Sequence, residues 1–129
     1  MSPRPRKPNA KATANPEVHV IDAAGRPLGR IASEVATLLQ GKRRATYDPR
    51  LLAPIEVHIE NARKVVVTGR KATQKRYYKH AGQLGHLKVR KFEDVFRKQP
   101  GWVIRHAIQN MLPKNRLRAK RLRQLFIRA

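Results

Sequence analysis

The sequence predicts a single α/β domain, because β-rich runs and amphipathic helical stretches follow one another along a chain of single-domain length. The chain has 129 residues, and compact domains cluster near one to two hundred. Leu, Ile, Val and Phe account for 31 of the 129 residues, which is about 24% and lies above the roughly 20% below which chains tend to be disordered. No apolar run approaches the ~18 residues of a membrane span. We therefore expect one core over residues 17–129, and no membrane partner.

Residues 1–16 are predicted to precede that domain as an extended, basic, Pro-rich arm. They hold four prolines and four Lys or Arg residues, with little apolar surface to bury, which is typical of a solvated segment. A mitochondrial targeting peptide is also basic, but it forms an amphipathic helix, which the prolines oppose. We interpret these residues as a tail.

The first elements of the domain are predicted to be a strand, a turn and a helix. Val18 to Ile21 form a β-rich run, and a turn through Gly25 follows. Apolar residues then recur at helical spacing up to Gly41, which suits a C-terminal cap. The stripe consists of Leu28, Ile31, Ala32, Val35, Leu38 and Leu39.

Two strands are predicted next. In residues 55–60 Ile55, Val57 and Ile59 alternate with polar side chains, the pattern of a strand with one wet face. A second strand is predicted from Val65 to Thr68.

The second half is predicted to contain strand and loop over residues 70–91, then two helices. Phe92, Val95 and Phe96 form a short helical stripe, and a longer stripe runs from Pro100 until Pro113 ends it. Residues 114–128 are predicted to form a basic helix followed by a short edge strand.

The charge of the chain indicates a polyanionic partner. It has 30 Lys and Arg against eight Asp and Glu, a net charge of +22, and residues 65–129 hold 18 of the basic and two of the acidic side chains. In a domain of about 14 Å radius of gyration many of these charges lie within a Debye length of ~8 to 10 Å. They repel one another unless an anion neutralises them, so a nucleic acid is the first hypothesis. Cysteine is absent, which excludes disulfides and thiolate metal sites.

The strongest nucleic-acid signal is a basic segment with two adjacent tyrosines, because positive charge and rings that stack on unpaired bases occur together. On a strand one of Tyr77 and Tyr78 is expected to pack inside and the other to face outward. The surrounding basic residues are Lys71, Lys75, Arg76, Lys79, Lys88, Arg90 and Lys91. Lys42, Arg43 and Arg44 form a second cluster on a turn, called the 42–44 turn below.

Other chemistries have weaker support. The five histidines show neither a helical i, i+4 pair nor a Cys partner for a metal, and the Gly82–Gly85 loop lacks the Lys and Ser or Thr of a nucleotide-binding loop. Glu56 and Glu60 would stand about 13 Å apart on a strand, too far to share one bond. The rivals that stay open are an RNA-processing enzyme using His80, His86 or His106 as acid and base, and a basic DNA-organising protein, whose groove-reading signature is not evident.

The order of motifs from about Val18 to Ile127 resembles the large-subunit ribosomal protein family L-thirteen. In the first half the similar residues are Ile21-Asp22-Ala23, Gly25, Leu28-Gly29-Arg30, Ala32, Ala36, Leu39, Gly41-Lys42, Tyr47, Pro49, Asn61-Ala62 and Val67-Thr68-Gly69. In the second half they are Lys71, Lys75, Tyr77-Tyr78, His80, Gly82, Gly85, Pro100, Val103, Ala107 and Met111-Leu112-Pro113-Lys114.

This resemblance implies a small, largely parallel or mixed sheet covered by helices, and a structural role in binding large-subunit rRNA early in ribosome assembly. It implies no catalysis, no cofactor and no small-molecule substrate, but contact with neighbouring ribosomal proteins in a cytoplasmic ribosome. A bacterial ribosome is favoured over an organellar one, which the sequence leaves open. The arm is expected to order only on RNA. The RNA-binding residues implied are Arg30, Lys42, Arg43, Arg44, Lys71, Lys75, Arg76, Tyr77, Tyr78, Lys79, His80, Lys114, Arg116, Arg118, Lys120 and Arg121.

The sequence also departs from the family pattern. Val18 stands where Trp is usual, Ala53-Pro54 replaces a Gly-Asp pair, and His86 and Arg118 replace glycines. The wet face of residues 55–60 conflicts with a sheet covered on both sides. We therefore predict that this strand lies at an edge or has an open outer face.

Overall fold

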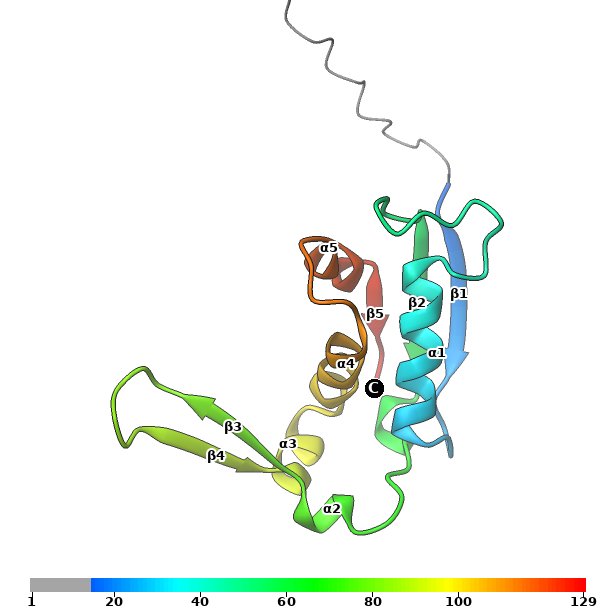
Figure 1. Ribbon diagram of the computed structural model, residues 1–129. Coiled ribbons are helices and arrows are strands. Elements are labelled where there is room, and N and C mark those ends of the chain that lie inside the picture. The colour runs from blue at the N-terminus through cyan, green and yellow to red at the C-terminus, as the bar shows by residue number, and fades with distance from the viewer. Residues whose placement is uncertain (1–14) are drawn as a thin grey trace, which may run out of the picture.

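A three-stranded parallel sheet forms the centre of the protein, as the computed structural model shows for residues 15–129 (Figure 1). The strands are β1 (Glu17–Asp22), β2 (Ile55–Glu60) and β5 (Leu125–Ile127), in the order β1-β2-β5. Strands β2 and β5 are neighbours in the sheet, although most of the second half of the chain lies between them in sequence. The sheet therefore joins the two ends of the domain. The predicted α/β class is confirmed, whereas the predicted 1–16 arm falls almost entirely outside the described residues.

Helix α1 (Leu28–Gln40) covers one face of the sheet, and its predicted apolar stripe is buried there. Ile31, Val35 and Leu39 are fully buried and belong to one cluster with Val57 and Ile59 of β2. Gly41 ends the helix in the left-handed conformation, and its amide donates to the carbonyl of Leu38. Helix α4 (Pro100–Met111) packs against α1 and completes the core.

The other face of the sheet is open. Val18 and Val20 of β1 are more than half exposed, and the ring of Phe126 on β5 stacks on His58 of β2 with centroids 4.9 Å apart. Strand β2 is nevertheless central and not at an edge, because β5 pairs with it in parallel register from Val57 to Ile59. The edge alternative of the prediction is therefore wrong, and the open-face alternative is confirmed.

The predicted strand from Val65 to Thr68 is absent, since only an isolated parallel bridge joins Val66 to Pro27. The chain leaves β2 through Asn61, at a positive φ of 57°, and a single 3-10 turn, η1 (Ala62–Lys64). Val66 then lies beside the loop before α1. Its amide donates a hydrogen bond to the backbone carbonyl of Arg26, and its carbonyl accepts one from the backbone amide of Leu28. The loop before α1 offers residues 65–68 no strand to pair with, and β-branched residues without a pairing partner do not form a strand.

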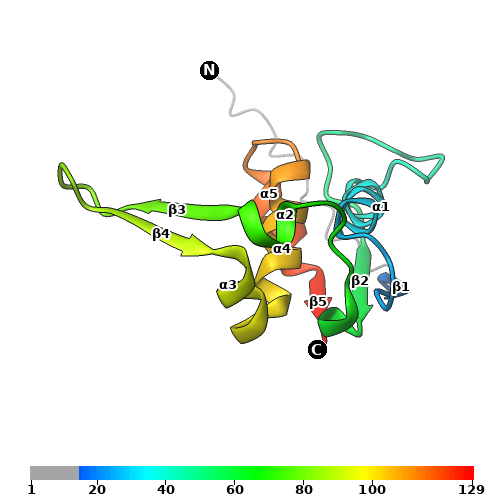
Figure 2. The same cartoon turned by 90° about the horizontal axis from the view of Figure 1, so that it is seen from below.

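A two-stranded antiparallel hairpin projects from the domain, as Figures 1 and 2 show. It consists of β3 (Arg76–His80) and β4 (Leu87–Lys91), and residues 76–91 are called the basic hairpin below. A one-turn helix, α2 (Lys71–Gln74), which the sequence pattern did not reveal, precedes it. Helices α3 (Phe92–Lys98) and α5 (Leu117–Arg123) appear as predicted. Among the described residues no helix has the length and apolarity to cross a membrane.

Gly41→Ala is expected to lower the free energy of unfolding by more than about 1 kcal/mol, because the residue has a φ of +74° and an added Cβ would stand 2.9 Å from the Cβ of Ala53. Gly29→Ala is the matched control, since nothing lies within 4 Å of its added Cβ. The control should leave stability unchanged or raise it by up to about 1 kcal/mol. Urea unfolding measures both, and equal effects would contradict the strained cap.

Candidate nucleic-acid interface

The basic hairpin places positive charges directly opposite one another. Its register pairs Arg76 with Lys91 and Lys79 with Lys88, and like charges in this position destabilise a two-stranded sheet. No acidic residue occurs in residues 76–91, and every residue of β4 is exposed. A ribbon of this kind gains stability when an external anion lies along it.

The two tyrosines of β3 face opposite sides, as predicted. Tyr77 is only 9% exposed, whereas Tyr78 is 65% exposed. The Tyr77 ring packs edge-on against Trp102 and His106 of α4, at centroid distances of 5.0 and 5.2 Å, and the ammonium of Lys75 lies 5.5 Å from its centroid. Burial raises the pKa of the Tyr77 hydroxyl, so this side chain is neutral. Tyr78 is the one free to stack on a base.

Arg30 meets the segment before the hairpin, although more than 40 residues separate them in sequence. The exposed Arg30 of α1 lines the same groove as Lys71 and Lys75. The bridge between Pro27 and Val66 brings these segments together. Three predicted site residues therefore form one cationic surface.

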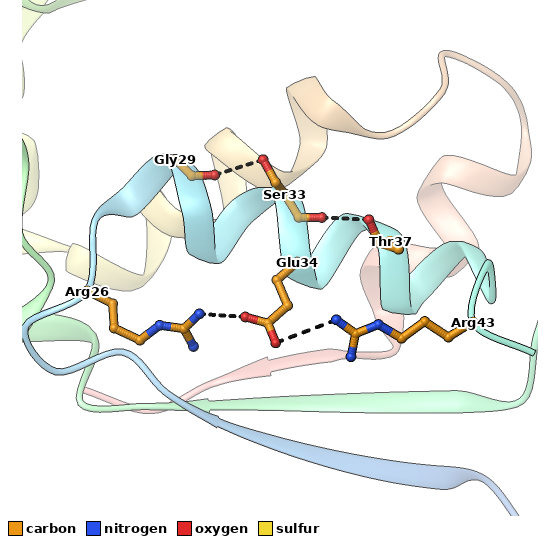
Figure 3. Close-up of polar contacts among 6 residues, drawn as sticks. All are labelled: Arg26, Gly29, Ser33, Glu34, Thr37 and Arg43. Carbon is orange, nitrogen blue, oxygen red and sulfur yellow. Dashed lines mark hydrogen bonds and ion pairs between the residues drawn. The ribbon is translucent and has the colours of Figure 1, made fainter.

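The 42–44 turn directly follows the glycine cap of α1, and its charges are only partly balanced. Glu34 lies between Arg26 and Arg43 (Figure 3), with one carboxylate oxygen 2.6 Å from Arg26 and the other 3.8 Å from Arg43. Lys42 is exposed and Arg44 half-buried, and neither forms an ion pair with an acid of residues 15–129. The turn therefore presents net positive charge.

The C-terminal basic residues differ in their access to a partner. Lys114, Arg116 and Lys120 are exposed and Arg118 is half-buried. Arg121 is only 2% exposed, and its Nε has no hydrogen-bond partner. A side chain buried this deeply offers no surface to RNA, so the expectation that Arg121 contacts RNA is wrong: this residue packs inside the domain.

The histidines give little support to catalysis or metal binding. Nδ1 of His80 accepts a hydrogen bond from the Gly82 amide at 3.0 Å. The ring of His106 is stacked on Trp102 at 4.8 Å, and desolvation, followed by the nearby charge of Lys75, lowers its pKa. No group of three or more potential metal ligands occurs in residues 15–129.

Sequence reasoning missed that Trp102, His106 and Asn110 line one groove with the hairpin. Their spacing of four residues places them on one face of a helix, which was the signal available. The contact with Tyr77 is tertiary and leaves no local pattern.

Residues 16–128 match the family described as Ribosomal protein L13. The chain belongs to this family. The large ribosomal subunit protein uL13 of Rippkaea orientalis is 45% identical, over 92% of this chain and 82% of its own. The proteins of the same name from Natranaerobius thermophilus and Clostridioides difficile are 42% and 41% identical, over 86% and 84% of this chain and 78% and 76% of their own. The resemblance seen in the L13 motifs is therefore confirmed.

Arg121→Met is expected to raise the free energy of unfolding by about 1 kcal/mol or more, because it removes a buried charge that has no acidic partner in residues 15–129. The salt dependence of RNA binding should not change. Thermal unfolding and binding titrations measure the two effects. A lower midpoint together with a flatter salt dependence would show instead that Arg121 contacts RNA.

Proposed function

We propose that the chain is a structural constituent of the large ribosomal subunit that binds large-subunit rRNA and helps early subunit assembly. The observation that carries this proposal is the basic hairpin, where like charges face each other across the ladder with no acid among residues 76–91. Membership of the L13 family and the names of its relatives support it. Because those relatives are bacterial, we place the protein in a bacterial ribosome in the cytoplasm.

The proposed mechanism is neutralisation of phosphates by a folded surface. Each phosphate contact releases condensed cations, so the logarithm of the affinity falls with the logarithm of the salt concentration by about 0.7 to 0.9 per phosphate. Only the folded chain presents the whole surface, so RNA binding stabilises the fold. Protein and RNA thus order each other during assembly.

The contact residues are proposed from four surfaces. The first is the groove that Arg30 lines together with Lys71 and Lys75. The second and third are the basic hairpin and the 42–44 turn, and the fourth is the exposed part of the C-terminal segment. The residues are Arg30, Lys71 and Lys75; Arg76, Tyr78, Lys79 and His80; Lys42, Arg43 and Arg44; and Lys114, Arg116, Arg118 and Lys120. Tyr77 acts from beneath, since it holds β3 on α4.

We propose that the protein acts without catalysis, cofactor or small-molecule substrate. Acid-base cleavage of RNA needs two titratable groups within reach of one phosphate. His106 is instead packed against Trp102 and Tyr77, both uncharged partners. This environment supports a stacking role for its ring.

A neighbouring ribosomal protein is the proposed partner of the open sheet face. The exposed Val18 and Val20 lie beside Glu56 and His58 in the sheet register, and Glu60 adds a second acid to β2. This combination repels phosphate and suits a basic protein segment with apolar side chains.

Reversal of all three charges, Lys42→Glu, Arg43→Glu and Arg44→Glu, is expected to weaken binding to a large-subunit rRNA fragment. The slope of log affinity against log salt should flatten by about 0.7 to 0.9 for each phosphate that the variant no longer neutralises. Filter binding at several salt concentrations measures both quantities.

The control carries the same change in net charge at exposed basic residues outside the proposed interface: Arg63→Glu, Lys64→Glu and Arg97→Glu. It should weaken binding less and keep the slope. An unchanged slope in the turn variant, or equal slopes in both variants, would remove the 42–44 turn from the interface.

A further inference from the structure

A groove between the root of the basic hairpin and α4 has aromatic walls and a cationic rim. Trp102, His106 and Asn110 line it from α4, and Lys75, Arg76 and Arg90 line it from the hairpin side. It is called the aromatic groove below. No acidic side chain lines it, so its charge is of one sign.

The ring geometry of this groove leaves the outer face of Trp102 uncovered by the other two rings. The rings of Trp102 and His106 stack nearly parallel, with 12° between their planes and centroids 4.8 Å apart. Tyr77 is perpendicular to both, at 5.0 and 5.2 Å. Because the three distances are nearly equal, Tyr77 lies beside the stack and not on top of it. Neither ring therefore covers the outer face of Trp102, and this residue is 38% exposed.

The basic groups around the stack suit the phosphate of a nucleotide. The guanidinium groups of Arg76 and Arg90 and the ammonium of Lys75 are suited to phosphate. Asn110 lies one turn beyond His106, on the opposite side of the stack from the outer face of Trp102, so base recognition at that face rests on stacking and not on this amide. The lowered pKa of His106 keeps its ring neutral at physiological pH, which adds a polarisable surface and no competing charge.

We propose that the aromatic groove receives one unpaired nucleotide of the bound RNA, whose base extends the His106–Trp102 stack while its phosphate meets the cationic rim. This inference rests on the proposed RNA-binding function and adds a specificity to it. A base inside a duplex already stacks on both faces, so the groove takes only a nucleotide that is unpaired or turned out of a helix.

The test uses the full chain and three RNA probes of about ten nucleotides. These are oligoadenosine, an abasic strand with the same number of phosphates, and a paired duplex. Trp102 is the single tryptophan of the chain, so its emission reports contact directly. Oligoadenosine is expected to quench this emission, whereas the abasic strand and the duplex bind with little quenching.

Variants assign the contact to the ring. Trp102→Leu is expected to weaken oligoadenosine binding about 5- to 150-fold, the range for loss of one stacked base, and to leave abasic binding unchanged. Trp102→Phe should restore most of the loss. Phe126→Leu, an exposed aromatic on the open sheet face, is the matched control and should change neither affinity. Anisotropy of end-labelled strands measures all of these.

The outcomes separate this inference from the function on which it rests. Equal affinity and equal quenching for oligoadenosine and the abasic strand would overturn the base site and leave RNA binding intact. A loss of both affinities in Trp102→Leu would also overturn it, because the ring would then serve only the fold. Failure of the wild-type chain to bind any probe would contradict both proposals.

Discussion

The packing of α1 against the central strand β2 is the contact on which the rest of the structure depends. Ile31, Val35 and Leu39 are fully buried in one cluster with Val57 and Ile59. Burial of such side chains contributes about 1.5 to 3 kcal/mol each. Because β5 returns to pair with β2 at the end of the chain, the same strand also closes the loop that carries α2, the basic hairpin, α3 and α4. The small core therefore sets the positions of surfaces that have little apolar packing of their own.

Charge balance is the second constraint, since eight acids face 30 basic side chains. The structure places Glu34 between two arginines at the start and end of α1, and Glu56 and Glu60 on the sheet. The basic hairpin and the segment after Asp94 receive none. Repulsion is thus relieved near the core and left in the projecting parts, where an external polyanion supplies the missing charge. This division separates a strongly basic side from an open sheet face that is poorer in positive charge.

Local periodicity predicted the type and position of most helices and strands, because the alternation of buried and exposed residues in each can be read from consecutive residues. α1 and its Gly41 cap, and α4 after Pro100, are examples. The run from Val65 to Thr68 shows that strand propensity alone is not sufficient. Its residues favour a strand, but the segment beside it is the loop before α1, and only an isolated bridge forms. The central position of β2 depends on three residues near the C-terminus, which no local pattern reveals.

The candidate site was predictable as a set of charges and less so as a geometry. Basic side chains without acids point to phosphate whatever their arrangement. The face of a short helix is harder to predict, and in α5 the core takes Arg121, while Leu117 and Leu122 stay half-buried. The aromatic groove joins Tyr77 to Trp102 and His106 across 25 or more residues, so only the folded chain brings it together.

Sedimentation of a cell lysate through a sucrose gradient, before and after a high-salt wash, tests the central claim most directly when the protein is detected in every fraction. Many simultaneous contacts with rRNA and neighbouring proteins predict that it stays on the large subunit after the wash. Release into the light fractions, or migration with DNA, would show a general affinity for polyanions and would contradict a structural place in the subunit.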